Sequence, residues 1–330
     1  MTHVRALPLD AATYSRHKTH AEDQLWVEKN CYIDIWLEVI HALGCEPLAV
    51  LPFTLAIDFE GDQWTFFKPP HGEIFDLYGI EVQELNVWRP LLDHAIEHLG
   101  AGKLISTESD AWWLPDTSGT DYRTRHSKTT IVLNEVDVER KLLGYFHNAS
   151  YHTLTGEDFD RTFRVDVPRD PTFLPLFAEV LRVGKVVRRP QEELVAHSRV
   201  LWARHLARRP ADNPIARFRT RFEKDLGWLT AEGLEFYHAW AFGTTRQLGS
   251  GAELVAMNLR WLAGAGDGGL DEAIAAFDAI SGACKTFILK GARAVNAKRA
   301  LDAGAMFEQM AAAWQRGTDA LDAKFAAKSV

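Results

Sequence analysis

Residues 30–44 read NCYIDIWLEVIHALG, and this stretch predicts an amphipathic α-helix near the start of the chain. Its apolar side chains recur at steps of three and four, at Ile33, Trp36, Leu37 and Ile40. Such spacing gathers these side chains in one stripe along a helix. Gly44 follows the last of them, and glycine is a typical residue to end a helix.

The predicted helix begins beside a cysteine. Asn30 is a good N-cap residue, so Cys31 falls in the first turn. There the unpaired N–H groups and the positive end of the helix dipole favour a thiolate over a thiol. Two interpretations stay open for Cys31, a nucleophile or a boundary residue without chemistry. Cys45 and Cys284 have the surroundings of ordinary buried cysteines.

The texture of the chain changes near residue 168. Before it, short apolar and aromatic runs alternate with Gly, Pro and Asp, which is typical of mixed α and β structure. After it, helical spacing dominates almost to the end. The length of 330 residues also suggests two domains. We therefore predict an α+β domain over residues 1–167 and an all-α domain over residues 168–330.

Composition excludes several classes of protein. A net charge of -8 argues against general nucleic-acid binding. No apolar run reaches the roughly 18 residues of a membrane span, and the first ten residues, MTHVRALPLD, lack the apolar core of a signal peptide. Three cysteines far apart in sequence do not form a disulfide framework. We expect a cytoplasmic protein that contacts neither membrane nor nucleic acid.

A nucleophilic cysteine needs a histidine within hydrogen-bond reach, and that histidine needs an orienting group. Residues 125–150 supply the geometry for such a pair. Two β-rich runs, SKTTIVL and KLLGYFHNAS, flank a polar turn, which predicts an antiparallel hairpin centred near Asp137.

The register of this hairpin selects the candidate pair. If Leu133 opposes Lys141, then His126 stands opposite Asn148, with Cβ atoms about 4.5–5.5 Å apart. The Asn148 side chain would then hold the imidazole. A slip of one residue would place a neighbour of Asn148 there instead. The alternative is an ordinary hairpin with a polar end.

A cysteine that opens the first helix, a histidine at the start of a strand and an Asn or Asp on the next strand follow the chain order of papain-like folds. Three stretches resemble the N-terminal domain of butirosin biosynthesis protein H, a papain-fold acyltransferase family. They are NCYIDIWLEVIHALG, ESDAWWLPDTSGTDYRTRHSKTTIVL and GYFHNASYHTL. The whole chain also resembles an uncharacterised bacterial family found near seryl-tRNA-synthetase-like enzymes that load amino acids onto carrier proteins.

The resemblance implies a papain-like fold and a set of roles. Cys31 would be the nucleophile, His126 the base and Asn148 the orienter, although peptidases of this broad class often have Asp in the third place. Gln24 is the nearest match to the oxyanion glutamine of papain-like enzymes, offset slightly from the usual spacing. Asn30 or the Cys31 backbone N–H is the alternative oxyanion donor.

The implied reaction moves an aminoacyl group from the phosphopantetheine thioester of a carrier protein, through a Cys31 thioester, to a small-molecule amine or thiol. No metal and no bound cofactor are expected, since the phosphopantetheine belongs to the substrate. The loop before His126 offers candidates for the acceptor or aminoacyl pocket, namely Asp110, Asp116, Thr117 and Tyr122. A carboxylate such as that of Asp110 suits a free amino group. The alternative is that these residues only shape turns.

Residues 182–224 hold twelve Lys and Arg against four Asp and Glu, a local charge of +8. Carrier proteins are typically acidic, so a basic face would steer one toward the enzyme. Arg188, Arg189, Arg208 and Arg209 are the candidate docking residues. The alternative is a solvated helical face.

Two other functions stay open. A hydrolase of the same fold, that is a peptidase, amidase or thioesterase, would use the same three residues and end on water. An open cleft would favour it, and a capped tunnel would favour transfer. A non-catalytic helical scaffold with a degenerate papain-like domain is the other alternative, and an unreactive Cys31 would support it.

Overall fold

A computed structural model of the chain describes residues 2–325 except residues 166, 169–171 and 173. The chain divides into two compact units. The first comprises Met1–Ala21, Asn30–Pro47 and Pro70–Arg188, and the second comprises Glu22–Lys29, Leu48–Pro69 and Arg189–Val330. The first is α+β and the second is helical, which confirms the predicted order of classes.

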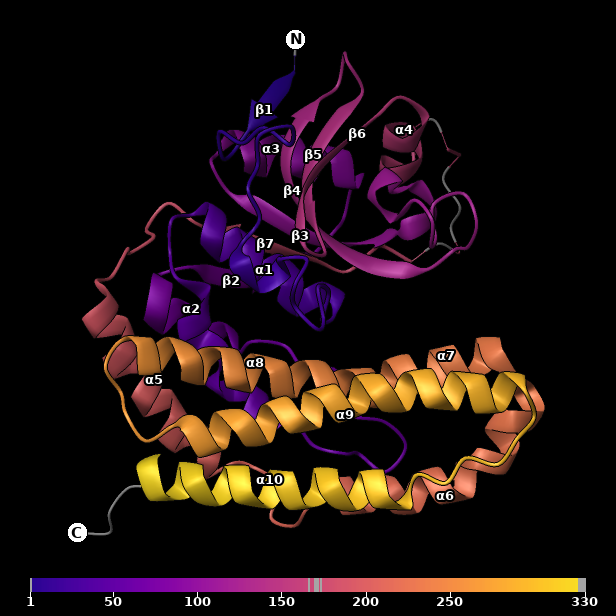
Figure 1. Ribbon diagram of the computed structural model, residues 1–330. Helices are drawn as coiled ribbons and strands as arrows, with labels where there is room; N and C mark the ends of the chain where they lie inside the picture. Colours follow the sequence, from indigo (N-terminus) through magenta and orange to yellow (C-terminus); the bar gives the residue numbers. More distant parts are fainter. Residues whose placement is uncertain (1, 166, 169–171, 173, 326–330) are drawn as a thin grey trace. The chain divides into compact units, whose positions relative to one another are not determined.

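An antiparallel sheet of seven strands forms the centre of the first unit, in the order β2-β7-β3-β4-β5-β6 with β1 paired to β4 (Figure 1). The strands are β1 (His3–Arg5), β2 (Glu81–Glu84), β3 (Leu104–Asp110), β4 (Lys128–Asp137), β5 (Leu142–His147), β6 (Ser150–Thr155) and β7 (Ala178–Arg182). Strand β3 pairs with the first half of β4, and β1 pairs with its last residues, so both strands share one edge of β4.

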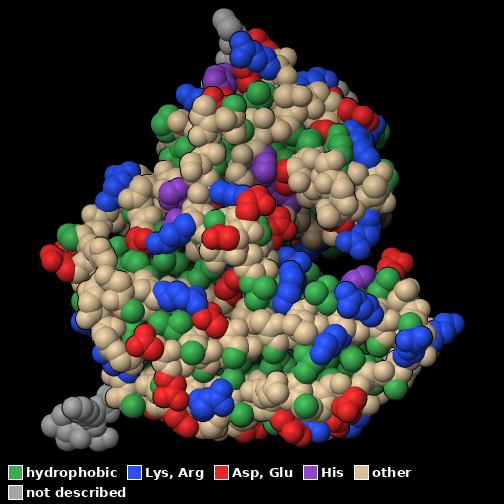
Figure 2. Space-filling view, in the orientation of Figure 1, with side chains coloured by type: hydrophobic (Ala, Val, Ile, Leu, Met, Phe, Trp, Pro, Cys, Tyr) green, Lys and Arg blue, Asp and Glu red, His purple; other side chains and the backbone are tan. Residues whose placement is uncertain are grey.

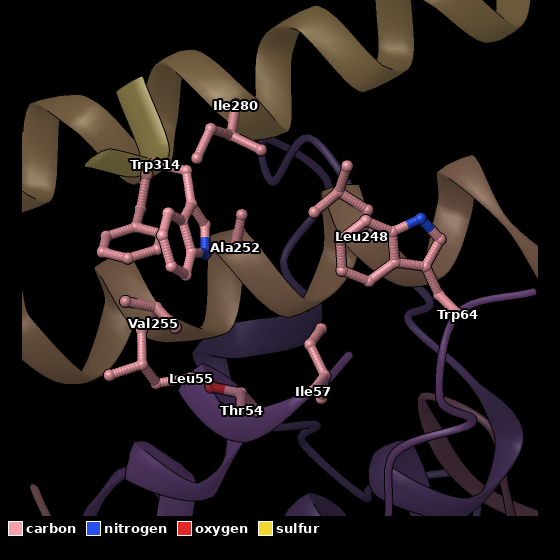
Figure 3. A pocket seen from close by; sticks show the side chains of 10 residues that line it. Thr54, Leu55, Ile57, Trp64, Leu248, Ala252, Val255, Ile280 and Trp314 are labelled. Carbon is pink, nitrogen blue, oxygen red and sulfur yellow. The ribbon is translucent and has the colours of Figure 1, made fainter. Parts of the chain in front are cut away.

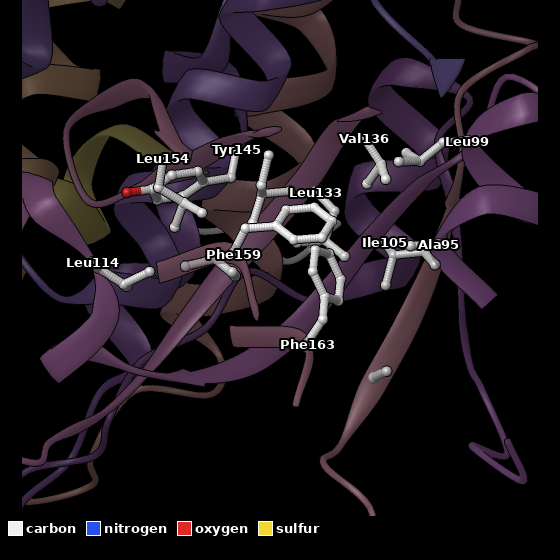
Figure 4. Close-up of a cluster of buried hydrophobic side chains, with 13 residues drawn as sticks. Ala95, Leu99, Ile105, Leu114, Leu133, Val136, Tyr145, Leu154, Phe159 and Phe163 are labelled. Atoms are coloured by element: carbon white, nitrogen blue, oxygen red, sulfur yellow. The ribbon is translucent and has the colours of Figure 1, made fainter. Parts of the chain in front are cut away.

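Helices and short 3₁₀ turns complete the first unit. They are η1 (Lys18–His20), α1 (Cys31–Ala42), α2 (His71–Tyr78), α3 (Leu91–Gly100), η3 (Ala111–Trp113), η4 (Pro115–Thr117) and α4 (Glu157–Phe163). One face of the sheet contributes Leu133 and Tyr145 to a core that Leu99 of α3 and Phe159 of α4 complete (Figure 4). Because side chains alternate along a strand, Phe146 points to the other face, where it packs against Tyr14.

Helix α1 has the boundaries that its sequence predicts. The Asn30 side chain accepts hydrogen bonds from the backbone N–H groups of Tyr32 and Ile33, so Asn30 is the N-cap. At the other end Gly44 has φ 75°, and the N–H of Cys45 donates to the Ile40 carbonyl. These bonds form a Schellman ending, which explains why the helix stops there.

A network of buried polar groups fixes α1 in the first unit. His20 is fully buried, and its Nδ1 lies 2.5 Å from Glu38 Oε1 while its Nε2 lies 3.1 Å from Asp34 Oδ1. The Tyr14 hydroxyl donates to Glu38 Oε2 over 2.6 Å. Asp34 and Glu38 lie one turn apart on α1, so one imidazole binds two turns of the helix at once.

The second unit consists of helices, together with most of the 3₁₀ segment η2 (Pro47–Ala56). The helices are α5 (Gln191–Leu206), α6 (Pro214–Glu232), α7 (Leu234–Gly243), α8 (Thr245–Gly264), α9 (Asp271–Asn296) and α10 (Gly304–Phe325). Early segments of the chain are bonded into it. The Trp26 indole donates to Ser281 Oγ over 2.9 Å, and Asn258 donates to the Leu48 carbonyl over 2.7 Å.

The first unit ends at Arg188 rather than at the predicted residue 167. The difference arises from β7, which pairs with β2 and β3 and so belongs to the sheet. Segments 22–29 and 48–69 also differ from the prediction, since they belong to the second unit. Among the described residues, no helix is long and apolar enough to cross a membrane.

Candidate active site

Cys31 is the first residue of α1 and is partly exposed. Burial is the strongest influence on its thiol and raises its pKa. Hydrogen bonds to the Thr129 side chain and the Thr130 backbone lower the pKa, as does the charge of Lys128, while the charge of Asp34 raises it. The net shift is upward. The helix start alone favours a thiolate, but desolvation outweighs it here and keeps the resting thiol protonated.

The pairing of β4 with β5 differs from the expected register. Leu133 opposes Tyr145 rather than Lys141, and a bulge between Leu133 and Glu135 shifts the pairing once more. Asn134 lies at this bulge and donates to the Tyr151 hydroxyl over 2.9 Å. The prediction that His126 stands opposite Asn148 is therefore wrong. The turn is also centred beyond Asp137, since β4 ends at that residue.

His126 pairs with a different residue. Its Nδ1 lies 2.6 Å from Asp110 Oδ2, and its ring stacks on Trp112 with centroids 4.5 Å apart. Asp110 Oδ1 accepts from the backbone N–H groups of Trp112 and Ser127, so the carboxylate is held in place. The His126 side chain is 68% exposed. Asp110, which we expected to bind a substrate amino group, thus makes the contact with His126 that we expected of Asn148.

Asn148 instead lies in the short turn between β5 and β6, where its φ is 46°. This left-handed backbone conformation is one that asparagine tolerates better than most residues. The turn explains the presence of asparagine at this position.

A second pair of His and Asp is connected to Cys31 through Thr129, and the sequence did not predict it. His147 Nδ1 is 2.5 Å from Asp116 Oδ2, and the Tyr145 hydroxyl donates to Asp116 Oδ1 over 2.5 Å. His147 Nε2 is 2.8 Å from Thr129 Oγ1. His147 is buried, unlike His126. Thr129 is therefore in contact with both His147 and the Cys31 thiol.

The charge state of this second pair follows from its surroundings. Burial raises the pKa of Asp116, but hydrogen bonds from His147 and Tyr145 and the charges of His147 and His152 outweigh it and lower the pKa overall. Burial lowers the pKa of His152, whose Nε2 lies 4.0 Å from Asp116. Asp116 is thus an ionised carboxylate that accepts from its neighbours.

The remaining loop candidates have local partners. The Thr117 hydroxyl lies within hydrogen-bond distance of the carbonyls of Ala111 and Leu114, and the Tyr122 hydroxyl donates to Asp158 over 2.9 Å. These bonds shape the loop, and pocket roles for Thr117 and Tyr122 stay predictions.

The candidate oxyanion donors also have bonds. Asn30 Oδ1 accepts the two bonds of the helix cap, and an oxyanion role for the Asn30 side chain stays a prediction. Gln24 belongs to the second unit and donates to the neighbouring Asp23 over 3.4 Å. The Cys31 N–H needs no movement of side chains to act, since it belongs to the nucleophile itself.

The basic stretch is largely neutralised within the chain. Arg189 pairs with Glu193, and Arg209 makes two bonds to Asp322. Arg188 donates to the Leu43 carbonyl, while Arg208 is exposed near the end of α5. Further pairs are Arg199 with Asp267, Arg217 with Asp58, Arg219 with Glu308 and Arg221 with Asp225. Figure 2 accordingly shows basic and acidic side chains interspersed. Docking of an acidic carrier stays a prediction.

A cavity of about 20 Å³ lies inside the second unit, lined by side chains that include Leu55, Ile57, Leu248 and Trp314 (Figure 3). A single water occupies about 10–15 Å³ by this measure, so the cavity is too small for an acyl group or a pantetheine arm. It is a packing defect of the helical core rather than a substrate site. In the described part of the chain, no three His, Cys, Asp or Glu side chains converge as a metal site.

The effect of Lys128 on Cys31 is open to direct test. The Lys128 side chain is 72% exposed, so solvent weakens its field. We expect Lys128→Gln to raise the pKa of Cys31 slightly and to slow its alkylation by iodoacetamide at pH 7.5 by about two- to threefold. Lys141→Gln is the matched control, because Lys141 is also exposed and paired with an acid, Asp160. Equal rates in both variants would contradict the electrostatic role.

Comparison with known families places a boundary between residues 183 and 191, which agrees with the end of the first unit at Arg188. The DUF1839 N-terminal domain matches residues 15–183, and the DUF1839 C-terminal domain matches residues 191–323. A search of curated proteins gives no match. Both domains of one family are present in order and together span most of the sequence. The chain therefore belongs to the DUF1839 family.

Proposed function

We propose that this protein is a cysteine-dependent acyltransferase, which takes an aminoacyl group from a carrier-protein phosphopantetheine thioester and passes it to an amine or thiol. The observation that carries the proposal is the position of Cys31. It opens a buried helix and is hydrogen-bonded to Thr129 and Thr130 of β4. Thr129 also contacts His147, which pairs with Asp116. The pair of His126 and Asp110 lies where the end of β3 meets the start of β4.

A papain-like arrangement of the first unit is part of this proposal. A cysteine at the start of a helix that packs on an antiparallel sheet, with a histidine just before a strand, agrees with such a fold. The resemblance to the N-terminal domain of butirosin biosynthesis protein H supports the aminoacyl donor. It does so through the sequence around Cys31 and His126, and the carrier-protein partner depends on it.

The chemistry suits a thiol. The Cys31 thiolate attacks the donor carbonyl, and the pantetheine sulfur leaves with the electrons of its C–S bond. The new thioester keeps the activation of the old one. A protonated His126 gives its proton to the leaving pantetheine thiolate. The neutral ring then takes a proton from the acceptor as the acceptor displaces Cys31. Asp110 holds Nδ1 and balances the imidazolium charge, which leaves Nε2 as the atom that exchanges the proton.

Intact-mass spectrometry tests the proposal. The protein is mixed with an aminoacylated carrier protein, and a mass gain of one aminoacyl group is expected on the wild-type chain but not on Cys31→Ala. Cys45→Ala is the matched control, because Cys45 is the other partly exposed cysteine, and it should still be acylated. An adduct that persists in Cys31→Ala, or no adduct and no release of acyl group in any variant, would contradict the proposal.

A hydrolase is the second candidate, and the exposure of His126 favours it. A side chain that is 68% exposed admits water to the base as readily as an amine. The same mixture separates the two functions. Free amino acid released faster than the aminoacyl group reaches any added amine indicates hydrolysis, whereas a stable acyl-enzyme that amines discharge indicates transfer.

A further inference from the structure

In the proposed function no residue has been assigned to remove the proton from the Cys31 thiol, and the inference that follows rests on that function. The resting Cys31 thiol is protonated, because burial raises its pKa. A base must therefore remove the proton during the reaction. Two histidines are candidates, His126 and His147, and they differ in burial, in partners and in their connection to the sulfur.

The hydrogen bonds around His147 have one consistent direction. Asp116 is ionised and can only accept, so the Tyr145 hydroxyl and His147 Nδ1–H both donate to it. With Nδ1–H donated to Asp116, Nε2 is the ring atom that can accept, and it lies 2.8 Å from the Thr129 hydroxyl. In the thiol form the lone pairs of Thr129 Oγ1 can then accept from the Cys31 S–H. After proton transfer the Thr129 hydroxyl donates to the thiolate, and this is the bond that lowers the pKa of Cys31. Along the series Cys31, Thr129, His147 and Asp116, each hydrogen-bond donor therefore faces an acceptor.

His126 has a different environment. Its ring is exposed and stacked on Trp112, and Asp110 holds its Nδ1. Such a ring reaches substrate and solvent freely. The buried His147, in contrast, is shielded from an incoming acceptor by the residues that pack around it. The two rings are therefore suited to different partners.

We infer that Thr129, His147 and Asp116 form a proton relay for Cys31, and that His126 with Asp110 serves the leaving and incoming groups. In the relay the Cys31 S–H bond breaks, and its proton moves to Thr129 Oγ1 as the Thr129 proton moves to His147 Nε2. The products are a thiolate and an imidazolium that faces the Asp116 carboxylate. When the acceptor displaces Cys31, the proton returns by the same route. Thr129 touches the reacting sulfur, and His147 acts through it.

Other titratable and charged groups also face this region and affect the pH dependence of the reaction. Tyr145 on β5 and His152 on β6 flank Asp116, and Asp34 on α1 and Lys128 on β4 act on the sulfur. Asp34 and Lys128 shift the Cys31 titration without accepting its proton. His152 is the nearest histidine that can serve as a control for His147.

Acylation by p-nitrophenyl acetate isolates the relay, since nitrophenolate leaves without a proton and no carrier protein is needed. The rate of the nitrophenolate burst is measured at pH 7, with acetylation of Cys31 confirmed by mass. We expect His147→Gln and Thr129→Val to slow the burst by about 100-fold or more. His152→Gln, a histidine outside the proton path, should stay within about threefold of the wild type. Thr129→Ser keeps the hydroxyl and should retain the wild-type rate within the same limit.

The pH dependence separates a relay from mere disturbance of structure. As pH rises toward the raised pKa of Cys31, the thiolate forms without a base. The deficit of His147→Gln should then shrink steadily, whereas a structural fault would give a constant ratio. A burst lost in His126→Gln and kept in His147→Gln, equal loss in Thr129→Ser and Thr129→Val, or a constant ratio at all pH values overturns the relay. The aminoacyl transfer assay is independent of these outcomes.

Discussion

Replacing His20 by leucine is expected to lower the free energy of unfolding by about 3–5 kcal/mol. The His20 imidazole is fully buried between Asp34 and Glu38, which are themselves fully buried. Removing it leaves two carboxylates that have lost their shared partner in a site that water does not reach. Removing one partner of a buried polar network costs far more than the network contributes, because the groups that remain lose a hydrogen bond that water cannot replace.

Urea unfolding followed by tryptophan fluorescence measures this loss. His3→Leu is the matched control, since His3 also pairs with a glutamate, Glu135, at 2.7 Å, but its side chain is 51% exposed. We expect that variant to change stability by no more than about 0.5 kcal/mol. A similar small change in His20→Leu would mean that the buried network does not hold α1.

Two glycines in helix α9 are expected to respond to alanine with opposite sign. At Gly291 an added Cβ would meet the hydroxyl of Tyr237 and would lie 2.6 Å from its Cζ. Tyr237 is fully buried, and its hydroxyl donates to the Ile288 carbonyl over 3.2 Å, so the ring has little room to move. We expect Gly291→Ala to lower the free energy of unfolding by about 1–3 kcal/mol through overpacking.

At Gly282 an added Cβ would have no atom within 4 Å. Only the gain in helix propensity remains, so Gly282→Ala should raise the free energy of unfolding by about 0.5–1 kcal/mol. Thermal and urea unfolding of the two variants in parallel measure the difference. Stabilisation by both substitutions would show that Tyr237 has space to yield at this crossing.

The sequence predicted α1 well because the residues that start, bury and end this helix all lie within it or next to it. Asn30 caps the helix, the apolar stripe buries it, and Gly44 ends it, all within fifteen residues of sequence. The pairing of β4 with β5 depends instead on the bulge near Asn134, which bonds to Leu7 in a distant part of the chain. The sequence of the hairpin alone does not indicate that Asn134 binds Leu7, so the predicted register was wrong.

The candidate site was likewise predicted only in part: its residue types were found from the sequence, but their partners were not. Cys31 and His126 were singled out from residue type and chain order, and their functional roles stay predictions. The partner of His126 depends on the pairing of Asp110 with Lys128 across β3 and β4, which hairpin reasoning did not consider. His147 was missed although it lies on a predicted strand. The signal was its alternation with Tyr145, which directs both side chains to one face and to Asp116.

The interleaving of the two units has a consequence for the order in which the chain can fold during translation and for where its gene can be divided. The first unit needs residues up to Arg188 before β7 can join the sheet, and the second recruits segments that emerge from the ribosome long before its own helices. Segments 22–29 and 48–69 therefore stay without the helices that bury them until most of the chain has been translated. A gene cut at the family boundary would separate the helices of the second unit from segments 22–29 and 48–69. The C-terminal family domain, produced alone, would therefore lack part of the unit in which it folds.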